Sequence, residues 1–227
     1  MLATEDGLDD IGVDRTPRLS DYGKFQEAMS WLCREKHEYE TCVLDTADWL
    51  EPAINAHVCQ VHGKGGIEDF GYGKGYTFAD EEWAKVLNGF EYLRTNKGMS
   101  IIILAHARVV KFMDPGSDGY DRYEPDLHKS ICSRLQEWCD EVFFATYKVA
   151  TKKTDEVFGR TRTRGIGSGD RVLYTSEMPT HLAKRRMSLP DMLPLKYEEY
   201  AKHLGNGQGN IDGVVVDGSS KRKGNQK

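Results

Sequence analysis

The chain has 227 residues, 39% of them hydrophobic and 30% charged, which is the composition of a globular protein with a polar surface. Its formal net charge of −5 gives no overall signature of nucleic-acid binding, so any such binding must come from local basic patches. No stretch approaches the roughly 18 apolar residues of a membrane span. Residues 1–14 carry five acids and no Lys or Arg, so we expect no signal or transit peptide. The five cysteines form no CxxC pair, which favours reduced thiols in a cytoplasm over a disulfide framework.

The first third of the chain predicts two strands and two helices. Residues 1–4 look like the end of a strand and lead into an acidic turn. An amphipathic helix is predicted after Ser20, with apolar residues at helical spacing. Residues 41–45 form a short apolar run without alternation, which is typical of a strand covered on both faces in a parallel sheet. A second helix is predicted over about 49–62.

The apolar run ends in Asp45. Ligands of parallel sheets lie beyond the carboxyl ends of the strands, and in P-loop NTPases an aspartate at this point holds Mg²⁺ against the nucleotide phosphates. The alternative is that Asp45 or Asp48 only caps the next helix, because Asp48 and Glu51 have the spacing of a capping box.

Residues 63–76 are rich in glycine and invite comparison with a phosphate-binding loop. They do not fit the pattern G-x-x-x-x-G-K-[ST], because a glycine follows the Gly-Lys pair, and no strand precedes them. Their interleaved lysines and aromatic residues suit a flexible binding loop or a solvated connector. The side chains that would contact a ligand are Lys64, Phe70, Tyr72 and Lys74.

A second buried strand follows another helix. Thr77 and Asp80 open that helix with capping-box spacing. Residues 99–105 are the most apolar run of the chain and end in His106. Two buried strands joined by a helical crossover make a βαβ unit, so Asp45 and His106 should face the same edge of the sheet. His106 then either belongs to a catalytic edge or is a histidine that satisfies its hydrogen bonds at a strand end.

Residues 108–129 are predicted to form a long polar loop of the length usually reserved for binding or lid functions. A helix over about 127–138 and a strand over 141–149 follow. Residues 157–176 predict a β-hairpin whose turn lies in the glycine-rich stretch 165–169.

This hairpin carries a basic patch. From Lys148 to Arg171 the chain has seven basic residues and three acids, a local charge of +4. Strand alternation places Arg160, Arg162 and Arg164 on one face, which is either a charged solvent face or a surface that binds the phosphate backbone of DNA. After a last helix, we expect residues 206–227 to be a disordered polar tail.

With these segments in place, residues 4–194 resemble the phage RecA-like P-loop ATPases, AAA-type nucleotide-binding proteins linked to single-strand annealing and recombination. The most specific segments are 4–8 (Thr-Glu-Asp-Gly-Leu), 44–52 (Leu-Asp-Thr-Ala-Asp-Trp-Leu-Glu-Pro), 66–76, 104–106 (Leu-Ala-His) and 182–186 (Leu-Ala-Lys-Arg-Arg). The resemblance implies an α/β fold: a RecA-like core over residues 1–205, with a largely parallel sheet flanked by helices and a C-terminal β-hairpin region.

The resemblance also implies roles for single residues. Asp45 is similar to the Walker B carboxylate that binds Mg²⁺, Glu5 to the glutamate that activates the attacking water, and His106 to the sensor of the γ-phosphate. Lys184 and Arg186 are similar to cations that reach the nucleotide of a neighbouring subunit, which implies a homo-oligomer. The implied cofactors are Mg²⁺ and ATP.

Single-stranded DNA is the implied partner, because the loops 63–76 and 108–128 take the place of the DNA-contacting loops of RecA-like proteins. The chain departs from the family in one respect: the Walker A loop, whose backbone amides and lysine cradle the phosphates, would lie upstream of Met1 with the strand before it. Arg185 also stands where the family motif has an asparagine. The expectation is either a truncated reading of a longer gene or a relic that kept the rest of the fold.

The leading hypothesis is therefore an ATPase core that acts in DNA recombination, annealing or replication and is impaired in nucleotide binding. One alternative is a non-enzymatic module that binds single-stranded DNA or serves assembly. Another is a metal-binding protein that uses His57, Cys59 and His62, although these three do not share one helix face at the i, i+4 spacing of a metal site.

Overall fold

The computed structural model describes residues 1–7, 11–114, 116, 118–157 and 160–204, and for residues 149–168 it describes the backbone alone. The tail expected to be disordered, residues 206–227, lies outside the described residues. The chain divides into two compact units, and the core expected over residues 1–205 spans both. The first unit comprises Met1–Val142 and Glu177–Lys184, and the second comprises Phe143–Ser176 and the residues from Arg185 onward.

The first unit is built on a parallel sheet. Among the described residues its strands lie in the order β1 (Leu2–Ala3), β2 (Thr41–Asp45) and β3 (Ser100–Ile103). The register pairs Ala3 with Asp45 and Leu44 with Ile103, so the carboxyl ends of the strands lie level. Both apolar runs are thus neighbouring parallel strands, and the mixed α/β class is confirmed.

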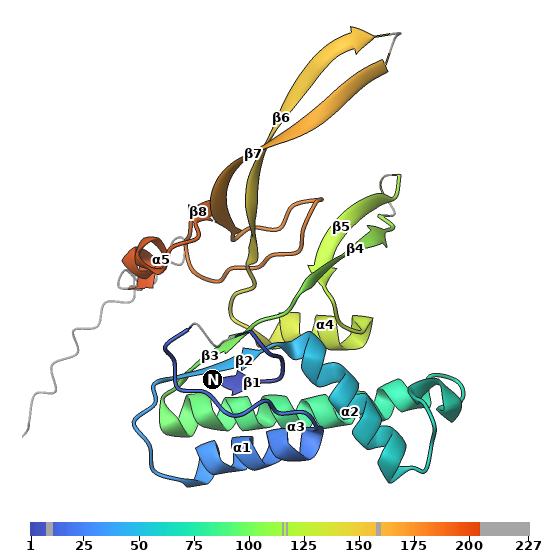
Figure 1. Ribbon diagram of the computed structural model, residues 1–227, viewed down its shortest axis with the longest axis vertical. Helices are drawn as coiled ribbons and strands as arrows, with labels where there is room; N and C mark the ends of the chain where they lie inside the picture. The colour runs from blue at the N-terminus through green and yellow to red at the C-terminus, as the bar shows by residue number, and fades with distance from the viewer. Residues whose placement is uncertain (8–10, 115, 117, 158–159, 205–227) are drawn as a thin grey trace, which may run out of the picture. The chain divides into compact units, whose positions relative to one another are not determined.

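Helices connect and cover these strands. They are α1 (Tyr22–Arg34), α2 (Ala47–Val61), α3 (Lys74–Lys97) and α4 (Lys129–Trp138), with the short 3₁₀ helix η1 at Ile67–Phe70. Figure 1 shows α1 and α3 side by side along the sheet, and α2 leaving the end of β2. Within the described ranges, no helix is both long and apolar enough to cross a bilayer.

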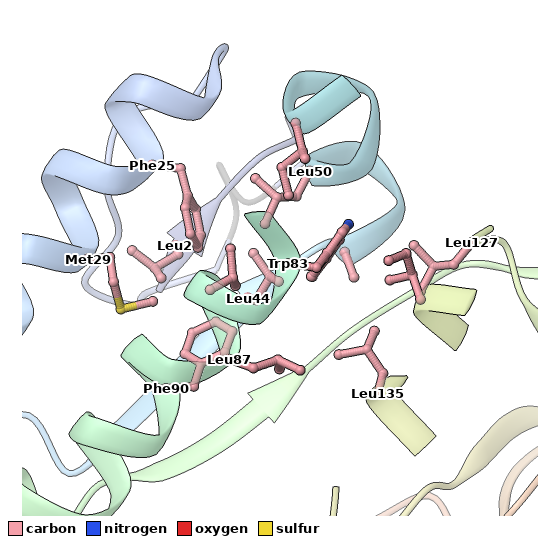
Figure 2. Close-up of a cluster of buried hydrophobic side chains, with 14 of the residues drawn as sticks. Leu2, Phe25, Met29, Leu44, Leu50, Trp83, Leu87, Phe90, Leu127 and Leu135 are labelled. Atoms are coloured by element: carbon pink, nitrogen blue, oxygen red, sulfur yellow. The ribbon is translucent and has the colours of Figure 1, made fainter. Parts of the chain in front are cut away.

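The sheet and helices share one hydrophobic core (Figure 2). Leu44 of β2, Leu50 of α2 and Trp83 of α3 are completely buried, and Leu127, just before α4, is 1% exposed. Figure 2 shows Trp83 between Leu50 and Leu127. Full burial of a large apolar side chain stabilises a fold by about 1.5–3 kcal/mol. The core therefore fixes the two elements that carry Asp45 and the residues after it.

The two edges of this sheet differ. The outer edge of β1 is covered by the following chain: the N–H of Leu19 donates to the carbonyl oxygen of Ala3 (2.8 Å), and the N–H of Ala3 donates to the hydroxyl of Thr16 (3.2 Å). In the described part of the chain β3 pairs only with β2, and the side chains of Ile102 and Leu104 are 46% and 41% exposed. The open edge of the sheet therefore lies at β3.

The prediction of a long loop over residues 108–129 is wrong. The segment is a hairpin of β4 (Ala107–Phe112) and β5 (Tyr120–Pro125). Its charged residues concealed the strand pattern, because an arginine takes an inner position. Arg122 is 4% exposed, pairs with Glu177 at 2.5 Å and lies over the ring of Phe112 at 4.9 Å.

The β-hairpin predicted over residues 157–176 is wrong, because its two predicted strands lie almost entirely in one strand, which pairs with residues 144–157. The strands of the second unit are β6 (Phe144–Val157), β7 (Arg160–Tyr174) and β8 (Met192–Pro194), followed by α5 (Tyr197–Leu204). The glycine-rich stretch predicted as the turn lies inside β7, where Gly167 pairs with Val149. Gly169 has a φ of +79° beside a shift in register, which is the conformation of a β-bulge. These glycines therefore serve an irregular strand rather than a turn.

Candidate functional site

Polar side chains from all three parallel strands gather at the carboxyl edge of the sheet. Asp45 is the last residue of β2, Glu5 comes shortly after β1, and His106 comes shortly after β3. The charges of Asp45 and Asp48 contribute to the pKa shifts of both Glu5 and His106, and these two residues also affect each other's pKa. The structure therefore brings Glu5, Asp45 and His106 together, as the sequence predicts, and adds Asp48 to them.

The turn from β2 into α2 is tied to both neighbouring strands. The hydroxyl of Thr4 donates to the carbonyl oxygen of Thr46 (2.7 Å) and accepts from the N–H of Thr46 (2.7 Å). The N–H of Thr4 donates to the carbonyl oxygen of Asp45 (2.7 Å), and the N–H of Ala47 donates to that of Leu104 (2.8 Å). The peptide bond between Asp45 and Thr46 is cis. This buried network fixes the backbone on both sides of the Asp45 carboxylate.

Asp48 holds His106 with both carboxylate oxygens. Its Oδ1 accepts from the backbone N–H of His106 (2.9 Å), and its Oδ2 lies 2.8 Å from the ring Nδ1. The hydrogen bond to Asp48, and then the charge of Asp48, raise the pKa of His106. Burial acts to raise the pKa of Asp48, but the hydrogen bonds from His106, Thr46 and its own backbone together outweigh it, so this pKa is lowered. Both pKa shifts favour the ion pair.

Asp48 is the functional residue that sequence reasoning missed. The helix begins at Ala47 with Thr46 as its N-cap, so Asp48 lies in the first turn and is not the cap that the capping-box interpretation requires. Glu51 does not complete a capping box either, because both of its carboxylate oxygens accept the N–H of His128, at 3.0 and 3.1 Å. A carboxylate in the first turn of a helix that leaves a sheet edge was the available signal.

The pKa of Glu5 is raised above that of an ordinary glutamate. Burial is the main cause that raises its pKa, and the charges of Asp45 and Asp48 act in the same direction, while His106 partly offsets them. A carboxylate with a raised pKa accepts a proton more readily. Asp45 itself is 7% exposed and completes the acidic edge.

A single magnesium ligand fits this edge better than a closed metal site. Among the described side chains, no group of three or more His, Cys, Asp or Glu residues is arranged to hold a metal ion. His57, Cys59 and His62 thus form no such group, and that alternative is not supported. Mg²⁺ usually takes one or two carboxylates together with waters and substrate phosphates, and Asp45 is the carboxylate in which β2 ends at this edge.

The start of α2 does not offer a cradle for phosphates. Helix N-termini bind anions through unpaired backbone amides. Here the N–H of Thr46 is bound by Thr4, and the N–H of Ala47 by the carbonyl oxygen of Leu104. The 227 residues also lack the pattern G-x-x-x-x-G-K-[ST].

The glycine-rich segment, residues 63–76, is a packed connection. A Cβ at Gly75 would collide with the carbonyl oxygen of Ile67 and approach the ring of Phe70 at 2.8 Å, so only glycine fits there. α3 begins at Lys74, before the predicted start at Thr77. Gly75 lies in its first turn, where the absence of a side chain lets the helix pack closely against Ile67 and Phe70. The capping box predicted at Thr77 is therefore wrong.

Two of the aromatic residues predicted to bind nucleic acid have different surroundings. The Phe70 ring packs against His62 and Phe78, with centroids 5.4 and 5.6 Å away, and Lys64 lies 5.9 Å above it. Tyr72 is fully exposed, with a φ of 50° between two glycines of positive φ. Lys74 is exposed at the start of α3. Tyr72 is thus presented to solvent, whereas Phe70 anchors the segment.

The side chains of the three predicted DNA-binding arginines lie outside the described residues. Their backbones are in β7, where Arg160 pairs with Val157, Arg162 with Thr154 and Arg164 with Lys152.

Lys184 and Arg186, predicted to act on a neighbouring subunit, belong to different units. The Lys184 amine donates to the carbonyl oxygens of Gln136 and Cys139 at 2.7 Å, and to that of Glu137 at 3.3 Å. It therefore closes the C-terminus of α4 in its own chain, and action on a neighbour would require it to leave these carbonyls. Arg186 is exposed.

Comparison with known proteins adds the family. Searches among curated proteins and among solved structures found no match. A family model described as AAA domain matches residues 1–187. The matched range contains the parallel sheet, its flanking helices and every residue that meets at the carboxyl edge. The chain therefore belongs to the AAA domain family, whose functions are of the nucleotide-binding, ATPase type.

Proposed function

We propose that the chain provides the catalytic edge of a phage RecA-like P-loop ATPase that acts in DNA recombination, annealing or replication. The observation that carries this proposal is the meeting of Glu5, Asp45 and His106 at the ends of three parallel strands. Ligands of open α/β sheets bind at this edge, and ATP hydrolysis needs a metal ligand, a base and a donor to the γ-phosphate there.

Each side chain has one role in this proposal. The Glu5 carboxylate accepts a proton from the attacking water, and its raised pKa suits that task. Asp45 is the protein ligand of Mg²⁺, which when bound neutralises charge on the phosphates. His106, held by Asp48, donates a hydrogen bond to the γ-phosphate.

The phosphate cradle is supplied from outside these 227 residues. The sequence holds no such loop, and the first amides of α2 are engaged. A strand that joined the open edge of β3 would end beside His106, and the loop after it would face Asp45 and Glu5. This arrangement supports the proposal that the chain is the greater part of a complete ATPase core.

Calorimetric titration of Mg-ATP into the 227-residue chain tests the missing cradle. We expect at most feeble binding, because a P-loop ATPase holds its nucleotide mainly through backbone amides and one lysine. Tight, Mg²⁺-dependent binding would show that the phosphate site lies elsewhere in the chain.

The catalytic assignment is tested in a version extended upstream through a G-x-x-x-x-G-K-[ST] loop. It should bind and hydrolyse Mg-ATP, and Glu5→Gln should retain binding but lose hydrolysis. The matched control is Asp6→Asn, which removes a neighbouring carboxylate that is 76% exposed and paired with Arg18. Equal activity of Glu5→Gln and Asp6→Asn would exclude Glu5 as the base.

A second candidate function is binding of single-stranded DNA without ATP. The fully exposed Tyr72 beside Lys74 favours it, because exposed aromatic rings stack on bases while lysines contact phosphates. Lys64 belongs to the same proposed surface of the first unit, and the arginines of β7 in the second unit are proposed as a separate set of phosphate contacts, with a homo-oligomer as the assembly.

Its test is affinity for single-stranded DNA as a function of salt. Each lost phosphate contact should flatten the log–log slope by about 0.7. The triple change of Arg160, Arg162 and Arg164 to alanine should flatten it, and Tyr72→Ala should weaken binding with the slope unchanged. An unaltered slope in the triple variant would mean that these arginines only face solvent.

A further inference from the structure

We propose that Asp48 is a positioning residue that fixes His106 as a hydrogen-bond donor to a phosphate-type oxyanion at the carboxyl edge of the sheet. The inference deepens the proposed function and rests on it. It assigns to Asp48 a task that the family resemblance does not give it.

The two oxygens of the Asp48 carboxylate contact different parts of His106. Oδ1 accepts the backbone N–H of His106 at 2.9 Å, which holds the chain after β3. Oδ2 lies 2.8 Å from Nδ1, which fixes the ring. Since Oδ2 of a carboxylate only accepts, Nδ1 must carry the hydrogen. Nε2, on the opposite side of the ring, then points away from Asp48, and the ring is 59% exposed.

The surroundings favour the form in which both ring nitrogens donate. The charges facing His106 are Asp48 of α2, Asp45 of β2 and Glu5 after β1, and all three raise its pKa. The nearby cation of β4, Arg108, is engaged by Asp126 and by the carbonyl oxygen of Leu127, at 3.3 and 2.7 Å.

Protonation decides what Nε2 offers to an anion. In the neutral ring with hydrogen on Nδ1, Nε2 is an acceptor and repels a phosphate oxygen. In the charged ring it is a donor, and a charge-assisted bond to an oxyanion is roughly twice as strong as a neutral one. By pairing with Nδ1 and stabilising the charged ring, Asp48 therefore favours the form in which Nε2 donates, and it does so from the opposite side of the ring.

Asp48→Asn distinguishes this role from a structural one. The amide oxygen of asparagine still accepts the backbone N–H of His106, so the turn is retained. The amide nitrogen, however, faces Nδ1 as a donor, so the neutral ring must move its hydrogen to Nε2. The matched control is Asp126→Asn, which removes a nearby charge that contacts Arg108 and leaves the ring untouched.

The experiment is ¹⁵N nuclear magnetic resonance of the histidine rings in the 227-residue chain, with His106→Gln to assign the signal. In the wild-type protein we expect the neutral His106 ring to carry hydrogen on Nδ1. Asp48→Asn should reverse the tautomer and make the ring titrate at lower pH, whereas Asp126→Asn should keep the tautomer. A wild-type tautomer with hydrogen on Nε2, or the same change in both variants, overturns the proposal.

Inorganic pyrophosphate is the probe for the oxyanion. At millimolar concentration without Mg²⁺, it should move the Nε2 signal of the protonated ring and raise the pH at which wild-type His106 titrates. In Asp48→Asn the neutral ring already carries hydrogen on Nε2, so pyrophosphate should raise the pH at which His106 titrates by less than in the wild-type protein. An equal rise in both proteins overturns the role of Asp48. A wild-type ring that ignores pyrophosphate overturns the oxyanion assignment. Because neither measurement uses ATP, a failure of the proposed ATPase function appears separately, as absent hydrolysis in the extended version.

Discussion

One hydroxyl group joins the turn at Asp45 to the neighbouring strand. Thr4 both donates to and accepts from the backbone of Thr46, and both residues are almost completely buried. We predict that Thr4→Val lowers the free energy of unfolding by about 1–3 kcal/mol, because it leaves a buried N–H and carbonyl without a partner. Thr4→Ser, which keeps the hydroxyl, should recover most of the loss. Urea denaturation measures both, and equal loss in the two variants would assign the effect to packing.

The Asp48–His106 pair should couple stability to pH. The raised pKa of His106 gives a contribution that is complete below about 6.5, the pKa of an unfolded histidine, and is lost as the pH rises through the folded value. The lowered pKa of Asp48 gives a contribution present above about 3.9 and lost as the pH falls through the folded value. The pair therefore contributes most between about pH 4 and 6.5.

We predict that Asp48→Asn lowers the free energy of unfolding more at about pH 5.5 than at about pH 9. The difference should be about 1 kcal/mol or less, because the ring of His106 is largely exposed and solvent screens the pair. Urea denaturation of both proteins at the two pH values measures it. A loss that is the same at both would show that Asp48 stabilises only through the backbone N–H.

At the level of elements, the open edge of β3 should promote self-association. Unpaired strand edges without charge or proline pair with other chains, and β3 reads Ser-Ile-Ile-Ile. We predict that Ile102→Lys reduces association in analytical ultracentrifugation, at little cost in stability because Ile102 is 46% exposed. Val61→Lys, at a 65% exposed position on α2, is the matched control. Association that persists in Ile102→Lys would place the contact elsewhere.

The C-terminus of α4 depends on one amine. Lys184 donates to three carbonyl oxygens there, and hydrogen bonds to charged groups contribute about 1.5–3 kcal/mol. We predict that Lys184→Met lowers the free energy of unfolding by that order, whereas Lys24→Met, which removes an exposed pair with Asp21, has an effect below about 1 kcal/mol. Thermal and urea unfolding give the comparison. Equal effects would mean that Lys184 is available for another partner.

Across the whole chain, sequence reasoning succeeded where one physical factor dominated. β2 and β3 are continuously apolar and were therefore recognisable as parallel strands, although β3 is partly exposed rather than buried as predicted. Strand polarity then placed Asp45 and His106 at one edge. Sequence reasoning failed where tertiary contacts decide. The buried Arg122 hid the hairpin β4–β5, and the contact of Gly75 with η1 moved the start of α3.

The partnership of Asp48 with His106 was beyond the sequence for a similar reason. The two residues lie 58 positions apart, and their contact arises because β2 pairs with β3, which places the start of α2 beside the chain that follows β3. A family resemblance identifies only the residues of the shared motifs. Asp48 lies in none of the assigned motif positions, so its contact with His106 could not be predicted.

α2 carries two carboxylates one turn apart that hold different parts of the first unit. Asp48 binds His106 at the sheet edge, and Glu51 accepts the N–H of His128 at the start of α4. Lys184 donates to carbonyl oxygens at the other end of α4. α2 thus connects the site to α4 through side chains in its first two turns. Any displacement of α2 would therefore strain its contacts with both His106 and His128, which couples the sheet edge to the start of α4.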